Sequence, residues 1–384
     1  MVIKKKFVIF VLILLLAGGC NNSTIASSKE SPSYGESVSL DTSVSSLEQP
    51  LSIPNNLCFH TSIQSSFING PLEEVNLYAN GVEELSKPLD TVLEWSSDYK
   101  NCDFYLSENQ DYSNPIIYHT DSNSLSLTNF KISTQYYYYL KSGDVLLKKG
   151  SFKTSNEIIR NLNISGVTNA RDLGGYPLDN GFLNQNILFR TGKLNKDLED
   201  TVTNLITEDG INTMLNYMGV KTEIDLRYID NNEVGGLTEG VGVLGNRVKY
   251  YQCPMDYYPE MDGDFNNESL RKVFSILGDK SNYPAFFHCS IGTDRTGYVA
   301  YLINGFLGVK EEYLWRDYLF SNFGNIGDRR TKDNIIDGYI RIVGETEGNT
   351  LQEKITNYLL NRGIKQTDLN TIREMMVSNS GQAA

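Results

Sequence analysis

The spacing of hydrophobic and polar positions changes at about residue 156 of the chain. Between residues 51 and 155, short apolar or aromatic runs recur between turn-forming residues, which is typical of β-strands. The runs are Val75–Tyr78, Val92–Trp95, Phe104–Leu106, Pro115–Tyr118, Leu125–Leu127, Tyr136–Leu140 and Val145–Leu147. About seven strands in about 100 residues predict an all-β sandwich over residues 51–155.

From residue 156 to residue 384 the pattern alternates between strands and helices, which predicts an α/β domain with a central sheet flanked by helices. Thr222–Arg227 has the alternating polarity of a strand, and Ala285–Phe287 is a short buried strand that ends at His288. The expected helices are Tyr298–Leu307, Leu351–Leu360 and Asp368–Val377, the last capped near Thr367.

The first residues form a targeting segment. Three lysines, Lys4 to Lys6, precede the apolar run Phe7–Leu16, which is too short to span a bilayer comfortably. The next four residues, A-G-G-C, resemble a bacterial lipobox, although Leu is commoner at the position of Ala17. That resemblance implies that Cys20 is lipidated (palmitate) and becomes the mature N-terminus. The alternative is an ordinary signal peptide cut at small residues.

We therefore expect residues 1–19 to be a signal peptide of a lipoprotein at the extracytoplasmic face of the cell membrane. Residues 20–50 are rich in Ser and Thr and have no apolar periodicity, so they are expected to form a flexible tether. On this interpretation the lipid on Cys20 is the protein's contact with the membrane.

Charge and composition narrow the possible partners. The formal net charge is −13, and it becomes −16 when residues 1–19 leave, because they carry three lysines and no acidic residue. An acidic surface argues against nucleic acid or anionic lipid as a general partner, so phosphate affinity must come from a local site. The five cysteines include no pair at metal-binding spacing, so we expect no metal and no cofactor.

Candidate chemistry lies in Phe286–Gly297, which reads F-F-H-C-S-I-G-T-D-R-T-G between a strand end and a helix start. Free backbone N–H groups and the helix dipole make such a loop an anion site. Cys289 lies in the same positive field, which favours its thiolate. The planar fork of Arg295 matches two phosphate oxygens, so the thiolate would face a bound phosphate as a nucleophile. The alternative is a buried structural cysteine beside a chance arginine.

The order His, Cys, five residues, Arg resembles the active-site loop of the protein-tyrosine-phosphatase superfamily. N-A-R-D-L-G-G at 169–175 and D-Y-L-F-S-N at 317–322 are similar to a bacterial family of tyrosine and phosphoinositide phosphatases, over residues 160–378. The resemblance implies that Cys289 attacks phosphorus to form a phosphocysteine, which water then hydrolyses. The phosphate would be bound by Ser290, Ile291, Gly292, Thr293, Asp294, Arg295 and Thr296.

The leaving oxygen needs a proton, and the sequence offers several acids. Asp294, inside the loop, is implied by the resemblance. Asp256, Asp262 and Asp264 lie on a preceding loop that could close over the site. We place Asp294 first and Asp256 second, and we expect Asp262 and Asp264 to be solvated surface carboxylates.

Several other residues have two interpretations. His288 either orders the loop or is a satisfied core histidine. Arg171 and Asp172 are expected to pair across a turn and brace the loop from behind, and the alternative is direct contact with the substrate. Thr296 is expected to donate a hydrogen bond to the sulfur. Cys253 is either a core thiol or a resolving partner for Cys289.

The substrate class depends on Thr293, because many members of the similar family have Lys there. We expect the side chain at this position to reach outward, so its lack of charge favours phosphotyrosine in a phosphorylated protein, or another small phosphomonoester. The alternatives are a phosphoinositide or inositol-phosphate phosphatase, or a catalytically weak module that binds phosphorylated ligands.

Trp95, the run Tyr136–Tyr139 and the closing residues Gly150–Thr154 of the β region resemble fibronectin type III-like modules, a fold close to the immunoglobulin sandwich. The sequence does not identify a ligand for this region. Cys58 and Cys102 either form a disulfide outside the cell or stay free.

Overall fold

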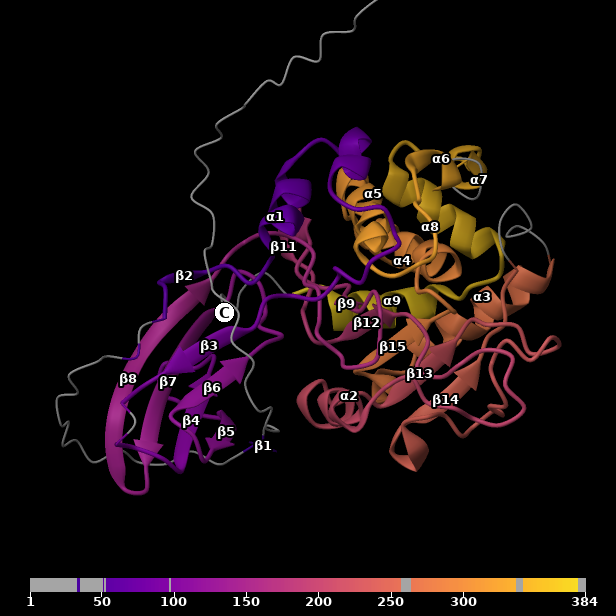
Figure 1. Ribbon diagram of the computed structural model, residues 1–384. Coiled ribbons are helices and arrows are strands. Elements are labelled where there is room, and N and C mark those ends of the chain that lie inside the picture. The colour runs from indigo at the N-terminus through magenta and orange to yellow at the C-terminus, as the bar shows by residue number, and fades with distance from the viewer. Residues whose placement is uncertain are drawn as a thin grey trace, which may run out of the picture.

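The computed structural model describes residues 33–34, 51, 53–96, 98–256, 264–335 and 341–378 (Figure 1). The predicted signal peptide, Cys20 and most of the predicted tether lie outside these residues, and so does Asp262. Within the described ranges, none of the helices combines the length and the apolar character that a membrane crossing needs.

The N-terminal part contains two β-sheets that share a hydrophobic core. The six-stranded sheet has the order β1-β5-β4-β7-β8-β2, and the smaller sheet pairs β3 with β6. Trp95 beside β3, Phe104 on β4 and Tyr136 on β7 belong to one buried cluster. The strands are β1 (Ser33–Tyr34), β2 (Asn56–Leu57), β3 (Thr91–Glu94), β4 (Cys102–Ser107), β5 (Ile116–Thr120), β6 (Ser124–Leu127), β7 (Gln135–Ser142) and β8 (Val145–Thr154). The likeness to fibronectin type III modules stays a prediction.

Six of the seven predicted strands are present, and the one at Val75–Tyr78 is wrong. That segment belongs to a 3₁₀ helix, η1 (Leu72–Leu77), which follows the helix α1 (Ser62–Asn69). The apolar positions of Leu72 and Val75 lie three residues apart, as on one side of a helix, and both join the core of the C-terminal part. Figure 1 shows η1 beside α5, where the backbone carbonyl of Phe67 also accepts a hydrogen bond from Arg316.

The C-terminal part is an α/β domain, as predicted. Its sheet has the order β14-β13-β15-β12-β9, in which only β9 runs antiparallel to its neighbour. The strands are β9 (Arg171–Asp172), β12 (Leu188–Thr191), β13 (Thr222–Asp225), β14 (Lys249–Gln252) and β15 (Ala285–His288), with a separate hairpin of β10 (Pro177–Leu178) and β11 (Gly181–Phe182). The helices are α2 (Glu208–Asn212), α3 (Asp264–Leu277), α4 (Asp294–Leu307), α5 (Glu311–Phe320), α6 (Lys332–Ile335), α7 (Arg341–Gly344), α8 (Leu351–Asn361) and α9 (Gln366–Met376).

Both faces of this sheet are covered, which explains why β15 is apolar up to its last residue, His288. Ala285 and Phe287 pack into the large core formed with α3, α4, α8 and α9, whereas Phe286 points into a second cluster with Met214 and Met218 on the other face. A strand buried on both sides reads as a continuous apolar run because neither face meets water. β15 therefore lies in the middle of the sheet and carries the candidate loop at its end (Figure 1).

Three predicted details of the elements differ from the structure. The helix after the loop begins at Asp294 and not at Tyr298, because the polar residues of the loop already have helical backbone. β13 is buried at every position, although its polarity alternates, since its acidic residues find buried partners. The predicted cap near Thr367 is wrong, because the N-cap of α9 is Lys365, whose side chain forms no capping hydrogen bond. At the start of α8, in contrast, the side chain of Thr350 accepts a hydrogen bond from the backbone N–H of Glu353.

A buried arginine joins the two parts of the chain. Arg160 donates to the carboxylate of Asp172 at 2.7 Å, and its other nitrogens donate to the backbone carbonyls of Asn129 at 2.7 Å and Phe130 at 2.9 Å. Because a charged group this deep needs partners on every side, its position fixes the loop after β6 against β9.

Candidate active site

The candidate loop spans Cys289 to Thr293, between the end of β15 and the first turn of α4. Cys289 is almost completely buried at the strand end. Gly292 has a φ of +69°, and a Cβ atom there would lie 2.4 Å from the carbonyl oxygen of Thr191. Only glycine fits this position, because both the backbone conformation and the contact exclude a side chain. The loop therefore turns sharply against β12.

Two side chains hold the loop carbonyls from behind. The amide nitrogen of Asn169 donates to the carbonyls of Ile291 and Gly292, both at 3.1 Å, and to the hydroxyl of Thr293 at 3.3 Å. Arg190 donates to the carbonyl of Gly292 at 2.6 Å. The C=O and N–H of a trans peptide point in opposite directions, so the N–H groups of Gly292 and Thr293 point away from Asn169. This is the orientation that an anion-binding loop requires.

Arg295 is held by a carboxylate that the sequence did not indicate. Glu233 accepts from both terminal nitrogens of Arg295, one at 2.8 Å, and from the hydroxyl of Ser290 at 2.6 Å. The backbone N–H of Tyr228 donates to the same carboxylate at 2.9 Å. Glu233 therefore fixes the orientation of the guanidinium beside the loop. It lies 62 positions before Arg295 on another loop, and no local pattern connects the two residues.

Behind Asn169 lies a buried network centred on Asp317. Arg171 donates to its carboxylate at 2.7 Å, Arg190 donates to the other oxygen, and Tyr176 donates at 3.0 Å. Arg171 also donates to the side-chain oxygen of Asn169. Burial alone would raise the pKa of Asp317, but the charges of Arg171 and Arg190 outweigh it and hold the pKa below its usual value. Asp317 therefore joins the two sequence motifs behind the loop.

The predicted pairing of Arg171 with Asp172 is wrong. The two residues are neighbours on β9, where successive side chains point to opposite faces of the sheet. Arg171 thus points to Asp317, while Asp172 accepts from Arg160 and from the backbone N–H groups of Gly174 and Asn186, each at 2.7 Å. Arg171 reaches the loop through Asn169, whereas the hydrogen bonds of Asp172 lead to the junction with the β region.

His288 is fully buried between the sheet and the loop. Its Nε2 lies 3.1 Å from a carboxylate oxygen of Glu223, and its Nδ1 lies 3.3 Å from the carbonyl oxygen of Cys289. The neighbouring carboxylate of Asp225 is also buried; burial favours its neutral form, but His288 and Arg227 outweigh burial and lower its pKa. These contacts place His288 against the backbone of the loop.

The two preferred acids lie on different elements. Asp294, the first residue of α4, accepts from Arg330 at 3.0 Å through each of its oxygens and from the hydroxyl of Tyr318 at 3.0 Å. Asp256 follows β14, and its backbone N–H donates to Asn266 at 2.7 Å. Asp264 is the first residue of α3. Asp294 is therefore the acid that lies within the loop-to-helix turn itself.

The other cysteines of the described residues lie outside the candidate loop. Cys253 is fully buried in the core, and burial raises the pKa of its thiol to about 12. Its thiol therefore stays neutral, which disfavours the resolving role. Cys58, which follows β2, and Cys102, the first residue of β4, are free thiols. The hydroxyl of Thr296, expected to bond to the sulfur, is buried and has no hydrogen-bond partner among the described residues.

The side chain of Thr293 does not reach outward as expected. The residue is fully buried and its hydroxyl faces Asn169. The backbone of the loop turns at Gly292 toward β12, so the next side chain points back to the supporting network. Position 293 is thus part of the support behind the loop.

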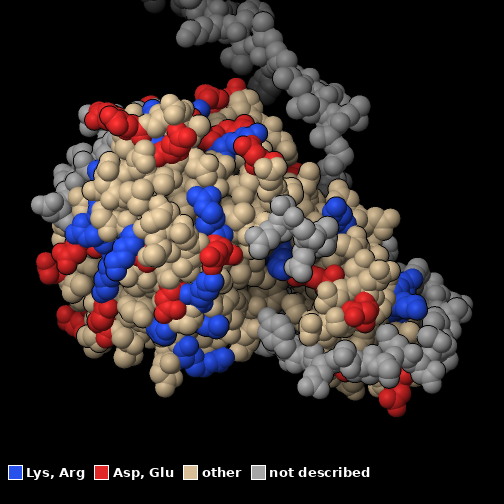
Figure 2. Space-filling model, turned by 180° about the vertical axis from the view of Figure 1, so that it is seen from behind, with Lys and Arg blue, Asp and Glu red and all other residues tan. Residues whose placement is uncertain are grey.

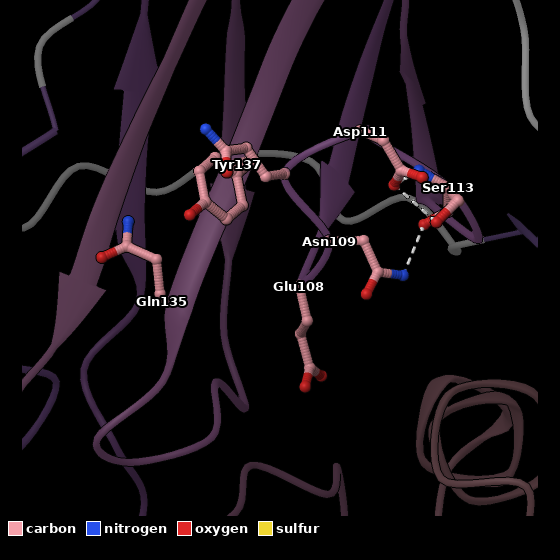
Figure 3. Close-up of a pocket in the computed structure, with 7 residues that line it drawn as sticks. Glu108, Asn109, Asp111, Ser113, Gln135 and Tyr137 are labelled. Carbon is pink, nitrogen blue, oxygen red and sulfur yellow. Dashed lines mark hydrogen bonds between the residues drawn. The ribbon is translucent and has the colours of Figure 1, made fainter. Parts of the chain in front are cut away.

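A separate pocket of about 440 Å³ lies in the β region (Figure 3). Its walls come from the loop after β4 and from β7, where Gln135 and Tyr137 face Glu108 and Asn109. The loop is held by Ser113, which accepts from Asn109 at 3.2 Å and donates to Asp111 at 2.6 Å. This pocket contains no residue of the candidate loop, so it is distinct from the phosphate site.

Comparison with known proteins identifies the C-terminal part. A model of the tyrosine phosphatase family matches residues 162–378, more than half of the chain. No curated protein matches the chain.

Among solved structures, the catalytic core of the PP-IP phosphatase SIW14 from S. cerevisiae, in complex with citrate, is 16% identical, with a TM-score of 0.27 over 43% of this chain and 90% of that one. TpbA from P. aeruginosa is also 16% identical, with a TM-score of 0.28 over 45% of this chain and 91% of that one. Scores this low establish neither a shared fold nor a shared substrate.

The family match covers every element of the site just described: the Asn169 motif, the loop with Cys289 and Arg295, and Asp317. The chain belongs to the tyrosine phosphatase family and is a cysteine-dependent phosphatase.

Proposed function

We propose that Cys289 is the nucleophile and that the loop from Ser290 to Thr296 binds the phosphate. The observation that carries this proposal is the placement of Cys289 at the start of one tight loop and of Arg295 in the first turn of α4 that follows it, with Arg295 oriented by Glu233. A thiolate facing a bound phosphate at a helix N-terminus has both its nucleophilic attack and its charge stabilisation arranged beforehand.

The reaction then has two steps. The sulfur of Cys289 forms a bond to phosphorus while the bond to the leaving oxygen breaks, and that oxygen takes a proton from an acid. Water attacks the phosphocysteine in the second step and releases inorganic phosphate and the thiolate. Arg295 and the loop N–H groups stabilise the phosphoryl oxygens in both steps.

Asp294 is our first choice for the acid and Asp256 the second. Asp294 lies in the turn that follows the loop, where Tyr318 and Arg330 fix its carboxyl group. Asp256 follows β14, which pairs with β13 next to β15. Arg330 donates to both carboxylate oxygens of Asp294. Asp294 must therefore exchange Arg330 for the leaving oxygen of the substrate before it can donate a proton.

For the substrate we favour a singly phosphorylated aryl group such as phosphotyrosine. This rests on the sequence, in which Thr293 replaces the lysine of many similar proteins. Acidic and basic side chains are interspersed over the face seen in Figure 2. Such a mixed surface offers no general attraction for phosphate, so we assign recognition of the phosphate group to the loop after Cys289. The buried position of Thr293 means that a missing lysine alone is not a full explanation.

One observation favours the alternative, a polyphosphorylated inositol substrate. The guanidinium of Arg330 lies beside Asp294 at the start of α4, where it adds a cation next to the loop. Comparing phosphotyrosine peptides with inositol phosphates on wild type and Arg330→Met separates the two. If the variant loses activity mainly on inositol phosphates, the alternative is favoured. If both activities fall together, Arg330 acts through Asp294.

The proposed location is the extracytoplasmic face of the membrane, with Cys20 lipidated and the β region as a spacer. It rests on the basic and apolar residues before Cys20.

The function as a whole is tested by turnover of p-nitrophenyl phosphate in the presence of a chelator. Hydrolysis by wild type that is lost in Cys289→Ser supports it. An inactive wild type that still binds phosphopeptides would instead indicate the binding module.

A further inference from the structure

Three residues with metal-binding side chains meet at the junction between the β region and the α/β domain. Cys58 and His60 follow β2, where the chain leaves the β region toward α1, and Glu157 follows β8, where the chain crosses a second time. Their ligand atoms all lie within 4.8 Å of one another. None of the three belongs to the loop of Cys289.

The distances between these atoms suit a single small cation. The Sγ of Cys58 lies 3.4 Å from Oε2 of Glu157, and Nδ1 of His60 lies 3.1 Å from the same oxygen. With zinc–nitrogen and zinc–sulfur bonds of about 2.0 and 2.3 Å, neighbouring ligands of a tetrahedral site are about 3.3 to 3.7 Å apart. Small shifts would therefore place the three atoms around one ion.

His60 is oriented as a metal ligand. The side chain is fully buried, and its Nε2 lies 2.8 Å from the carbonyl oxygen of Ile159. A carbonyl only accepts, so Nε2 carries the hydrogen, and in the neutral ring Nδ1 carries a lone pair. Nδ1 lies at ion-pair distance from Oε2 of Glu157, 3.1 Å, and it forms no hydrogen bond to any described residue. Donation of the outer N–H to a backbone carbonyl is the usual arrangement of a histidine bound to a metal.

We propose that Cys58, His60 and Glu157 form a Zn²⁺ site that ties together the two chain crossings at the junction. One sulfur, one imidazole and one carboxylate match the ligand preference of zinc. On binding, the thiol of Cys58 releases its proton to solvent, and its thiolate and the carboxylate balance the two charges of the ion. The side chain of Glu157 is 19% exposed, so a water molecule can complete the coordination. The rival interpretation is a buried ion pair between His60 and Glu157 without a metal.

The test is a titration of the purified full chain with Co²⁺, which replaces Zn²⁺ and shows a thiolate-to-metal absorption band. We expect the band to saturate at about one equivalent per chain, and zinc to compete it away. Cys58→Ser should lose the band, whereas Cys289→Ser, which removes the other candidate thiolate, should keep it. Loss of the band in Cys289→Ser, or its persistence in Cys58→Ser, overturns the proposal.

A second variant separates metal binding from folding. Glu157→Gln keeps the size of the side chain, so it should leave circular dichroism and phosphatase activity near wild type while weakening zinc binding by at least about tenfold. Unchanged zinc affinity in this variant, or the absence of bound Co²⁺ in folded wild type, would leave only the ion pair between His60 and Glu157 and so contradict the zinc site.

Discussion

The carboxylate of Glu233 sets the orientation of the Arg295 guanidinium. Glu233 accepts from both of its terminal nitrogens and also holds Ser290 in the loop. An arginine that binds phosphate as a planar fork depends on its orientation as much as on its charge, so we regard Glu233 as a positioning residue.

Glu233→Gln should therefore lower kcat/KM by about tenfold to a hundredfold, equivalent to about 1.4 to 2.8 kcal/mol of transition-state stabilisation. The amide of the glutamine keeps one acceptor for Arg295 but has no negative charge to pair with the guanidinium. Arg295 would then be less well oriented toward the transition state, so most of the loss should appear in kcat. Steady-state kinetics on an aryl phosphate measures this. Glu374→Gln, at an exposed glutamate of α9, is the matched control and should behave as wild type. Equal kinetics for the two variants would remove Glu233 from this role.

The thiols of the chain should differ in reactivity. Burial raises the pKa of Cys253 to about 12, so near neutral pH its thiol is almost entirely protonated and should react slowly. Iodoacetamide near neutral pH should modify Cys289 in the folded protein and leave Cys253 unmodified, as read by peptide mass spectrometry. Both should react once the chain is unfolded in urea. Rapid alkylation of Cys253 in the folded protein would show that this thiol is accessible and ionised.

Some of the site was predictable from the sequence and some was not. Cys289 and Arg295 are six positions apart in one motif, so their joint placement follows from a single turn. Glu233 reaches Arg295 only because the loop after β13 meets the first turn of α4. Arg171 pairs with Asp317 and not with Asp172 because neighbouring side chains on β9 point to opposite faces of the sheet. Contacts of this kind depend on the packing of distant segments.

At the scale of elements, the loop is held between β15, α4 and the segment of Asn169. The amide of Asn169 satisfies two loop carbonyls that have turned away from the phosphate side. A buried carbonyl without a donor costs about 1 to 3 kcal/mol, so the shape of the loop depends on this side chain.

Asn169→Asp should both destabilise the protein by about 1 to 3 kcal/mol and reduce kcat, because the carboxylate cannot donate to the carbonyls of Ile291 and Gly292. Urea unfolding gives the first quantity and steady-state kinetics the second. Asn370→Asp, on the exposed side of α9, makes the same chemical change away from the loop. A wild-type midpoint and kcat in Asn169→Asp would contradict the bracing role.

The elements themselves were predicted with uneven success. β15 and α4 were recognisable because a continuous apolar run next to a glycine-bearing loop has few alternatives in an α/β domain. The segment at Val75–Tyr78 was assigned to a strand, since a short apolar run does not distinguish a strand from a helical turn. Its helical form depends on the surface of α5 that it covers, which is about 240 positions away in the chain.

For the whole molecule, the arrangement of the two parts is fixed by Arg160 and by the packing of α1 and η1 on the α/β domain. These contacts hold the β region and the catalytic part in one arrangement. The lipid anchor that we propose rests on Cys20, which lies outside the described residues.

Cys20→Ala should release the protein from the membrane fraction, because lipid at this cysteine is the proposed attachment. Fractionation followed by immunoblotting measures the distribution. Ser27→Ala, in the same tether, is the control and should remain bound. If Cys20→Ala stays in the membrane fraction to the same extent as wild type, lipidation at this residue is wrong.

The central claim is that a phosphoryl group passes through the sulfur of Cys289. Rapid acid quenching during turnover of a phosphotyrosine peptide, followed by peptide mass spectrometry, tests it most directly. We expect phosphate on the peptide that contains Cys289, and less than a few per cent of wild-type turnover in Cys289→Ser. Phosphate trapped on another residue, or a Cys289→Ser variant that keeps substantial activity, would contradict the account.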